Sequence, residues 1–316
     1  MYYIGLDVGG TNLAAGVVDR DGNILQKLSR PVDKRMTADE LCIELGRLAV
    51  DVCAAAGLGI GDINAVGAGF PGMVDNLSGV VISTPNMPFR GTRFRELFRA
   101  VCDADVYLGN DAKCAAIGEY MAGAAKGCDP AVVVTLGTGI GGGMVTGGRL
   151  FTGYAGSGTE IGHMIIRPGG VPCGCGNRGC WEQYGSATAL IRITREEMER
   201  SPESLLWELC SGDIGKVQGR TAFDGVKRGD DAARRALDTY LEGLALGLSN
   251  IINILHPEVI CLGGGISNAD DSLLLEPLRE MALSNSFDKV TPTRIVKAAL
   301  GNDAGIVGAA LLCNML

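Results

Sequence analysis

The sequence lacks any run of about 18 uncharged apolar residues, so it contains no candidate transmembrane helix. A basic leader with a cleavage site is also missing, because the chain passes from Met1 directly into the strand-like segment YYIGLDV. These absences predict a cytoplasmic protein with no membrane partner. The chain has no cluster of basic residues either, and its formal net charge is −8. We therefore expect no nucleic-acid partner.

Two common motifs of nucleotide-binding loops are missing as well. The sequence contains no G-x-x-x-x-G-K-[ST], and no G-x-G-x-x-G lies between a strand and a helix. It does contain 48 glycines, and three groups of them end apolar strands: DVGGTN (7–12), LGTGIGGG (136–143) and CLGGGIS (261–267). Glycines at a strand end can present consecutive N–H groups to an anion. Each group alone could be an ordinary hairpin turn, but the three together favour a nucleotide bound in an interdomain cleft.

The glycine groups carry further candidate ligands. Asp7 precedes the first group and could hold Mg²⁺, directly or through water, while Gly9, Gly10 and Thr11 face phosphate oxygens. The second group offers Thr138 and Gly139 to the phosphates, and the third suits the nucleoside part.

The distribution of strands and helices predicts an α/β protein. Residues 2–30 alternate apolar strands with the turns GGTN and RDGN, which indicates a three-stranded meander. A helix is predicted from Thr37 to about Ala56, and further helices at 231–255 and 304–314. Residues 131–151 repeat the opening design of strand, glycine turn and strand. This repetition favours two related lobes, each with a sheet, and a cleft between them.

The predicted lobes have approximate boundaries. We expect an N-terminal α/β lobe at 1–112, joined by the C-terminal helix at about 300–316, and a larger α/β lobe at 113–299 that carries the clustered cysteines.

Most of the eleven cysteines are scattered singly through apolar or helical segments. Such cysteines are typical of small buried hydrophobes in a reducing compartment. The eight residues of this kind are Cys42, Cys53, Cys102, Cys114, Cys128, Cys210, Cys261 and Cys313.

The other three cysteines lie in CGCGNRGCWE, at C-x-C-x4-C spacing. Cys173, Cys175 and Cys180 can converge on one ion, with His163 of TEIGHM as a fourth ligand. A closed set of four N or S ligands is typical of a structural zinc site, which folds a loop and leaves no position open for water. A C-x-C redox pair or unligated surface thiols are the alternatives. The other histidine, His256, precedes a proline at a helix end and is expected to cap that helix.

Three carboxylates stand where they could bind or activate hydroxyl groups. Glu160 and Glu182 adjoin the proposed zinc ligands and could accept hydrogen bonds from sugar hydroxyls, unless they are ordinary surface residues. Asp111 ends the strand DVYLGN, where it could take the proton of an attacking hydroxyl. As an alternative or additional role, Asp111 could be the N-cap of the helix that follows.

The motifs DVGGTN, GND, LGTGIGGG, EIGH, CGCGNRGCWE and PEVICLGGGIS stand in this order along the chain. Together they closely resemble the ROK family of bacterial sugar kinases and related repressors, within the actin-like, hexokinase-like ATPase superfamily. The resemblance runs from Ile4 to the C-terminus, and EIGH and CGCGNRGCWE are its most specific parts. Thr159 stands where many members have glycine, which bears on the fine shape of the pocket. The first strand begins at residue 2, so we expect no winged-helix module of the repressor type.

The resemblance implies a role for each matching residue. It makes Asp111 the general base, and it implies that His163 both touches sugar and ligates zinc. The implied ATP-binding residues are Asp7, Gly9, Gly10, Thr11, Thr138, Gly139, Gly264 and Gly265, the last two at the adenosine. The implied sugar-binding residues are Asn86, Asn110, Asp111, Glu160, His163 and Glu182.

The implied activity is ATP-dependent, Mg²⁺-assisted phosphorylation of the 6-hydroxyl of a hexose, with glucose as the favoured acceptor. Other acceptors stay open, among them mannose, fructose, allose, N-acetylmannosamine and N-acetylglucosamine. A sugar-sensing regulator without catalysis is the rival from another class, and intact Asp111 and phosphate loops argue against it. The family commonly forms homodimers, which we expect here as well.

Overall fold

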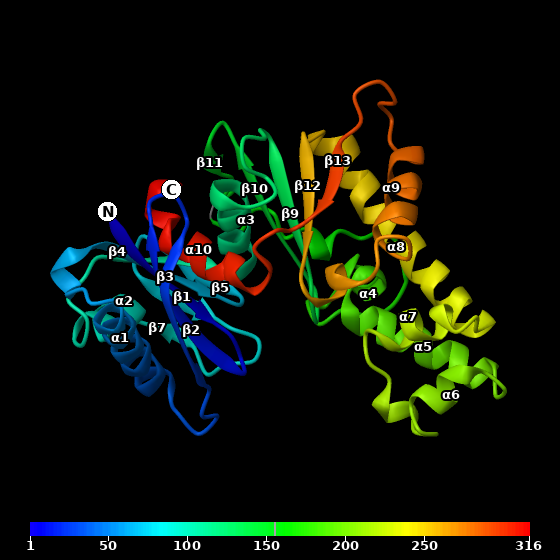
Figure 1. Cartoon of the computed structure of the whole chain (residues 1–316), viewed down its shortest axis with the longest axis horizontal. Helices are drawn as coiled ribbons and strands as arrows, with labels where there is room; N and C mark the ends of the chain where they lie inside the picture. Colours follow the sequence, from blue (N-terminus) through cyan, green and yellow to red (C-terminus); the bar gives the residue numbers. More distant parts are fainter. Residues whose placement is uncertain (155) are drawn as a thin grey trace. The chain divides into compact units, whose positions relative to one another are not determined.

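The computed structural model describes residues 1–154 and 156–316, which form two compact units. Unit 1 comprises Met1–Val133, Gly143–Thr159 and Ala298–Leu316, and unit 2 comprises Val134–Gly142 and Glu160–Lys297. The end of the chain thus folds with its beginning, as the blue and red segments in Figure 1 show. No helix in the described ranges is long and apolar enough to span a membrane.

Unit 1 is built on a five-stranded sheet in the order β3-β2-β1-β4-β8. Its first three strands form the predicted antiparallel meander, and β4 and β8 run parallel to β1. The strands are β1 (Tyr2–Val8), β2 (Asn12–Asp19), β3 (Ile24–Pro31), β4 (Ile63–Phe70) and β8 (Val106–Asn110). Because β1, β4 and β8 are parallel, their carboxyl ends lie at one edge of the sheet.

Helices cover both faces of this sheet. Alternate residues of β1 point to opposite faces, so that Ile4, Leu6 and Val8 pack with α1 (Ala38–Ala55) while Tyr3 packs with the side of α3 (Asp111–Ala122) and α10 (Ala304–Ala310). The predicted start of α1 is confirmed, since Thr37 and Glu40 form a reciprocal capping box.

The helix α10 lies very close to the sheet of unit 1. A Cβ atom on Gly5 would stand 1.9 Å from the carbonyl oxygen of Ile306, and one on Gly67 would stand 1.7 Å from that of Ala309. Only glycine at these two strand positions allows such an approach. The predicted last helix ends earlier than expected, at Ala310, and a 3-10 turn (Leu312–Asn314) follows it.

A small antiparallel sheet completes unit 1. It contains β5 (Met73–Asp75), β6 (Val80–Ser83) and β7 (Arg90–Thr92), and α2 (Phe94–Arg99) lies next to it. Phe70, Phe89 and Phe94 meet edge to face in the core beneath, with ring centroids 5.0–5.4 Å apart.

A second five-stranded sheet has the order β11-β10-β9-β12-β13. Its strands are β9 (Ala131–Leu136), β10 (Ile140–Thr146), β11 (Arg149–Leu150), β12 (Val259–Gly263) and β13 (Arg294–Lys297). β9 and β10 form the predicted second glycine hairpin, and β12 and β13 pair in parallel.

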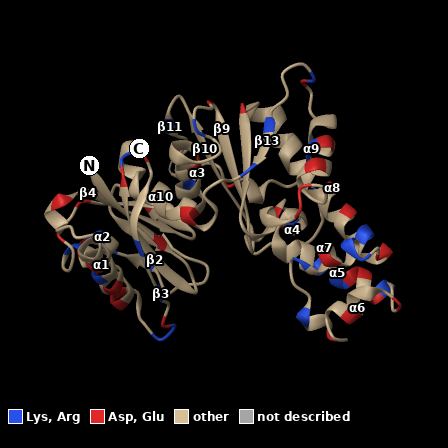
Figure 2. Ribbon diagram, viewed as in Figure 1, with Lys and Arg blue, Asp and Glu red and all other residues tan. Residues whose placement is uncertain are grey.

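Unit 2 contains the helices that surround the long helix α8. The predicted range of α8, Asp231–Leu255, is confirmed, and His256 is its C-cap with a left-handed φ of 41°. The other helices are α4 (Glu182–Gly185), α5 (Ala187–Arg200), α6 (Leu205–Leu209), α7 (Thr221–Lys227) and α9 (Leu275–Ser284). Acidic and basic residues are interspersed along α5, α6 and α7 in Figure 2.

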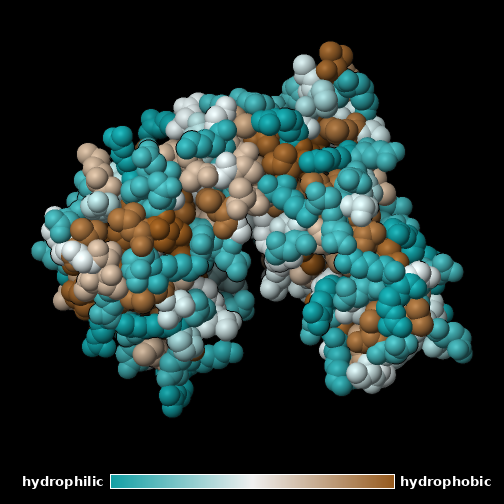
Figure 3. Space-filling model, viewed as in Figure 1, coloured by the Kyte–Doolittle hydropathy of each residue, from teal (hydrophilic) through white to brown (hydrophobic). Residues whose placement is uncertain are grey.

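The surface of unit 2 exposes a few large apolar side chains on the segment between α9 and β13. Phe287 and Val290 are 93% and 88% exposed. They belong to the loop at the tip of this unit, where brown atoms gather in Figure 3.

The scattered cysteines are located as predicted. Seven of the eight are buried, Cys313 is half-buried, and no disulfide joins any cysteines in the described part of the chain.

Candidate active site

Two carboxylates meet at the edge of the unit 1 sheet. Asp7 lies at the end of β1, and Asp111 follows β8 directly. Burial and, to a smaller extent, the negative charge of Asp111 raise the pKa of Asp7 to about 6, although Lys27 acts in the opposite direction. The two carboxylates are therefore close enough to interact. A protonation equilibrium near neutral pH suits a group that gains a cation when substrate binds.

Asp111 is not the N-cap of α3, so that alternative prediction is wrong. The N-cap is Asn110, whose side-chain oxygen accepts hydrogen bonds from the backbone N–H groups of Ala112 (3.0 Å) and Lys113 (3.2 Å). Asp111 is the first residue of the helix, where its charge interacts favourably with the helix dipole. The Asn110 amide also donates to the carbonyl of Gly72 (3.2 Å). Asn110 thus fixes the backbone that carries Asp111.

The first glycine loop lies beside Asn86 in unit 1. The Gly9 N–H donates to the Asn12 carbonyl over 3.0 Å and closes the turn between β1 and β2. A Cβ atom on Gly10 would lie 3.8 Å from the Cβ of Asn86. Thr11 is exposed at the end of this loop. The structure thus brings one predicted sugar-binding residue to the predicted phosphate loop.

The second glycine turn lies beside Glu182 in unit 2. A Cβ atom on Gly139 would stand 2.6 Å from Oε2 of Glu182, so a larger residue here would displace the end of this carboxylate. The turn is fixed to the start of α5, because the Thr188 hydroxyl donates to the Thr138 carbonyl (2.7 Å) and the Ala187 N–H donates to the Gly137 carbonyl (2.9 Å). A predicted phosphate turn and a predicted sugar-binding carboxylate are therefore neighbours.

The four predicted metal ligands converge in unit 2. The ligand atoms of His163, Cys173, Cys175 and Cys180 all lie within 4.8 Å of one another. The Sγ of Cys173 is 3.7 Å from Nδ1 of His163, and the Sγ atoms of Cys175 and Cys180 are 3.6 Å apart. A tetrahedron with metal–ligand distances of about 2.3 Å has edges of about 3.7 Å. The donor set and its spacing therefore fit a tetrahedral zinc ion.

This cluster is connected to Glu182 and to the core. The Cys173 thiol donates a hydrogen bond to Oε1 of Glu182 over 2.9 Å, and Nδ1 of His163 lies 3.9 Å from the same oxygen. The intervening Trp181 is fully buried, and its indole N–H donates to the Gly243 carbonyl of α8 over 3.1 Å. Glu182 is thus held between the cluster and a buried anchor.

Glu160 is attached to the same cluster through the main chain. It directly precedes the 3-10 turn Ile161–His163, and its carbonyl accepts a hydrogen bond from the His163 N–H (3.1 Å). Its side chain is exposed. A rigid His163 therefore fixes the backbone of Glu160.

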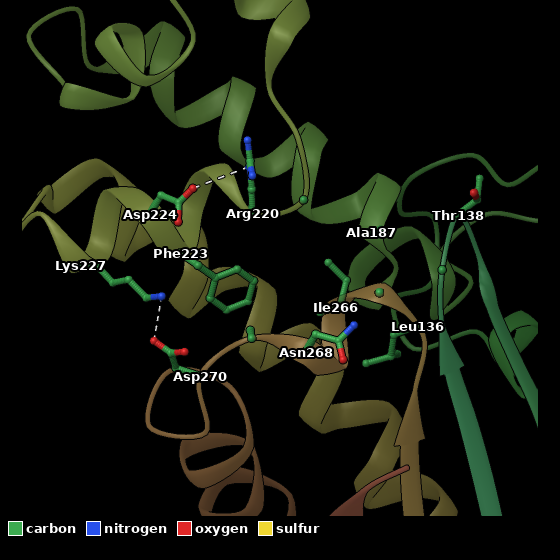
Figure 4. A pocket seen from close by; sticks show the side chains of 14 residues that line it. Leu136, Thr138, Ala187, Arg220, Phe223, Asp224, Lys227, Ile266, Asn268 and Asp270 are labelled. Carbon is green, nitrogen blue, oxygen red and sulfur yellow. Dashed lines mark ion pairs between the residues drawn. The ribbon is translucent and has the colours of Figure 1, made fainter. Parts of the chain in front are cut away.

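The third glycine group joins the second at the end of the sheet. Gly264 has a φ of 89°, and a Cβ atom there would stand 2.4 Å from the carbonyl oxygen of Leu136. This close packing puts the end of β12 against the end of β9. Both ends line a pocket of about 440 Å³ that lies wholly within unit 2 (Figure 4). Gly265 lines it together with Gly137, Thr138 and Ala187.

The sequence patterns missed the opposite wall of this pocket. One stripe along α7 provides it, consisting of Arg220, Phe223, Asp224 and Lys227. The spacing i, i+3, i+4, i+7 puts these side chains on one helix face. An aromatic residue within a charged stripe in GRTAFDGVKRG was the available signal, but it does not distinguish a pocket wall from a packed surface helix.

The predicted residues are distributed over both units. Unit 1 holds Asp7, Gly9, Gly10, Thr11, Asn86, Asn110 and Asp111. Unit 2 holds Thr138, Gly139, Glu160, His163, Cys173, Cys175, Cys180, Glu182, Gly264 and Gly265. Each unit therefore contains at least one glycine turn and at least one carboxylate from the predicted set.

The chain is similar to known proteins over nearly its whole length. The sequence matches the ROK family over residues 3–315. It is 36% identical to a glucokinase of Thermotoga maritima over 97% of this chain and 95% of that protein. A solved ROK glucokinase from Streptomyces griseus, in complex with glucose and AMPPNP, superposes with a TM-score of 0.83 at 34% identity and covers 99% of both chains. A ROK hexokinase from Thermus thermophilus gives 0.82 at 34% identity, over 98% of this chain and 97% of that one.

The comparisons agree with the α/β architecture described above. The fold is that of hexokinase-like sugar kinases, which is the actin-like ATPase fold. The chain belongs to the ROK family.

Proposed function

We propose that this protein is a glucokinase, which transfers the γ-phosphoryl group of ATP to the 6-hydroxyl of glucose. The observation that carries this proposal is the similarity along the full chain to a glucokinase structure with glucose and AMPPNP bound. The glycine turns and carboxylates described above lie at the motifs that make up this resemblance.

Asp111 is the proposed general base. A phosphoryl transfer needs an oriented hydroxyl and a carboxylate that takes its proton. The Asn110 cap holds Asp111 at the first turn of α3, and the charges of the Asp7 and Asp111 carboxylates are close enough to interact. Asp7 would hold Mg²⁺, directly or through water, and a bound cation would compensate its buried charge.

The glycine turns are the proposed phosphate sites. Gly9, Gly10 and Thr11 would contact phosphate oxygens from unit 1, and Thr138 and Gly139 from unit 2. Gly264 and Gly265 would border the adenosine, which the pocket of unit 2 could accommodate. Backbone N–H groups stabilise charge that develops on the transferred phosphoryl group without moving during the reaction.

The sugar hydroxyls are assigned to Asn86, Asn110, Glu160, His163 and Glu182, together with Asp111. The strongest support is the position of Glu182, which touches both the phosphate turn at Gly139 and the cluster at Cys173. An acceptor at this position would orient a hydroxyl close to the γ-phosphate.

The cluster of His163, Cys173, Cys175 and Cys180 is a proposed structural zinc site. When bound, the ion would supply no reaction chemistry but would hold the loop that carries both glutamates. Its ligands would then fix Glu160 through the backbone and Glu182 through side-chain contacts.

A coupled assay of ADP release tests the proposal. The purified protein would be assayed with ATP, Mg²⁺ and a panel of glucose, mannose, fructose, allose and the N-acetylhexosamines. We expect the highest kcat/KM with glucose. A preference for another sugar would keep the kinase and change its acceptor, whereas binding of sugar without turnover on any of them would indicate a sensor. We also infer a homodimer from the family resemblance, which light scattering tests.

A further inference from the structure

The stripe along α7 that forms one wall of the unit 2 pocket contains acidic and basic side chains with different partners. Nζ of Lys227 lies 2.8 Å from Oδ2 of Asp270, so these two groups satisfy each other. Asp224 lies between Phe223 and Lys227 in the sequence and has a different environment. Its nearest cation is Nε of Arg220 at 3.9 Å, which is too long for a hydrogen bond.

The carboxylate of Asp224 can therefore accept hydrogen bonds from a ligand. In the described ranges 1–154 and 156–316, no N–H or O–H group donates a hydrogen bond to its carboxylate. Its side chain is 44% exposed, yet it lines the pocket beside the buried ring of Phe223. Figure 4 shows Phe223 extending from α7 toward Ile266 and Asn268, with Asp224 on the same wall. A carboxylate in such a position can exchange its hydrogen bonds with water for hydrogen bonds from a ligand with neutral or positive donors.

The charges on the wall also disfavour a bare polyphosphate chain. Arg220 and Lys227 are the cations of the lining, and each is paired with a carboxylate, Asp224 or Asp270. The positive charge of this wall is thus compensated. A chain of phosphates needs uncompensated cations, whereas a ribose offers uncharged hydroxyl donors to a carboxylate.

Resting on the proposed function, we propose that Asp224 is a specificity-determining residue for the phosphoryl donor. Its carboxylate accepts a hydrogen bond from a ribose hydroxyl, so that the enzyme selects a ribonucleoside triphosphate over both a deoxyribonucleotide and inorganic polyphosphate. Phe223 and Ile266 provide apolar surface for the base beside it.

Steady-state kinetics of the whole protein with saturating glucose test this role. The donors are ATP, 2′-dATP, 3′-dATP and polyphosphate. We expect Asp224→Ala to raise the KM for ATP about tenfold at an unchanged kcat, because a hydrogen bond to a charged acceptor is lost. One of the deoxynucleotides should show the same elevated KM with the wild type and no further change with the variant. Asp224→Asn keeps an acceptor oxygen and should recover most of the discrimination.

A matched control is available on α8. Arg234 and Asp238 form an i, i+4 pair at 4.0 Å with Asp238 50% exposed, which closely resembles the Arg220–Asp224 pair but does not line the pocket. Asp238→Ala should leave all donor constants unchanged.

Several results would overturn the proposal. One is an equal rise of KM with all three nucleotides in Asp224→Ala, and another is an unchanged KM for ATP in that variant. A third is wild-type turnover of polyphosphate as efficient as that of ATP. Because the comparison is between donors for one variant, partial misfolding does not mimic the expected pattern. A wild type that phosphorylates glucose but shows no discrimination refutes the role of Asp224 alone, whereas no turnover with any donor refutes the proposed function.

Discussion

Units 1 and 2 hold their candidate site residues by different means. In unit 1, Asp7 and Asp111 stand at the ends of strands in a regular sheet, and Asn110 caps the helix that begins with Asp111. In unit 2, Glu160 precedes a 3-10 turn and Glu182 begins the one-turn helix α4, and four converging side chains connect these short segments. The hydrophobic core of the sheet positions the first pair, whereas a ligand cluster positions the second.

This difference has an energetic consequence. Unit 1 keeps a half-buried carboxylate whose pKa is raised, so its site costs stability when Asp7 is ionised. The loop of unit 2 has little regular structure of its own, so its stability should depend on whether the cluster is occupied. The two halves should therefore respond to different perturbations.

The largest effect is expected from Asp111→Asn in unit 1. The amide cannot take a proton, so kcat should fall by about 10² to 10⁴, whereas glucose affinity measured by calorimetry should change little. Asp105→Asn is a suitable control, since the side chain of Asp105 is exposed, pairs with Arg99 (3.2 Å) and is not among the proposed site residues. Near-normal turnover of Asp111→Asn would remove Asp111 from the role of base.

The second-largest effect is expected from loss of a zinc ligand, which should affect unit 2 and leave unit 1 unchanged. Replacing Cys175 or Cys180 by serine should remove a ligand, lower the zinc content below about half an equivalent and reduce kcat/KM by about 10- to 100-fold. Elemental analysis gives the metal content, and hydrogen exchange should show loss of protection in 160–182 but not in β1 or β8. Cys313→Ser, at a half-buried cysteine outside the cluster, is the control. Zinc-free protein with full activity would contradict the structural role.

The third effect is a change of stability with pH that arises in unit 1. The pKa of Asp7 rises from 3.8 to about 6 on folding. Between these values the native state binds more protons than the unfolded state, so the free energy of unfolding falls as pH rises, by about 3 kcal/mol at most. Asp7→Asn should therefore stabilise the protein above pH 6 by about 1–3 kcal/mol, and the gain should disappear below about pH 4.

Chemical denaturation without Mg²⁺ or nucleotide measures this dependence. Asp33→Asn is a control of opposite sign, because hydrogen bonds from Arg35 lower the pKa of Asp33 to about 2. That variant should lose stability at neutral pH, where Asp33 is ionised in both states. An Asp7→Asn variant that is less stable than the wild type at neutral pH would show that the ionised carboxylate of Asp7 does not destabilise the native state.

The same difference between the units explains what the sequence could predict. The meander, α1 with its capping box and α8 follow from local hydrophobic periodicity and capping residues, and these predictions are confirmed. The Cys3His set could be predicted because its ligands lie within 18 positions of one another, so that loop closure is short.

Longer-range features could not be predicted in this way. The neighbouring positions of Gly139 and Glu182 depend on how the turn of β9 and β10 packs on α5, which no local pattern encodes. The same holds for Asp224, whose stripe on α7 becomes a pocket wall only because β12 and β9 end opposite it. The N-cap prediction for Asp111 was wrong by one residue, because Asn110 and Asp111 both have side chains suited to a cap.

The smallest effect concerns the close approach of Gly139 and Glu182 in unit 2. A methyl group in Gly139→Ala would stand 2.6 Å from Oε2, so the flexible end of Glu182 must move by a few tenths of an ångström or more. Because the cluster continues to hold the loop, stability should change by less than about 1 kcal/mol. The KM for glucose should nevertheless rise several-fold, since a hydroxyl acceptor has been displaced. Gly61→Ala is the control, because a Cβ there would meet no atom within 4 Å and Gly61 lies in unit 1, outside the proposed site. Equal kinetics for both variants would mean that Glu182 tolerates displacement, and the ligand cluster would then stabilise the loop without orienting its carboxylate.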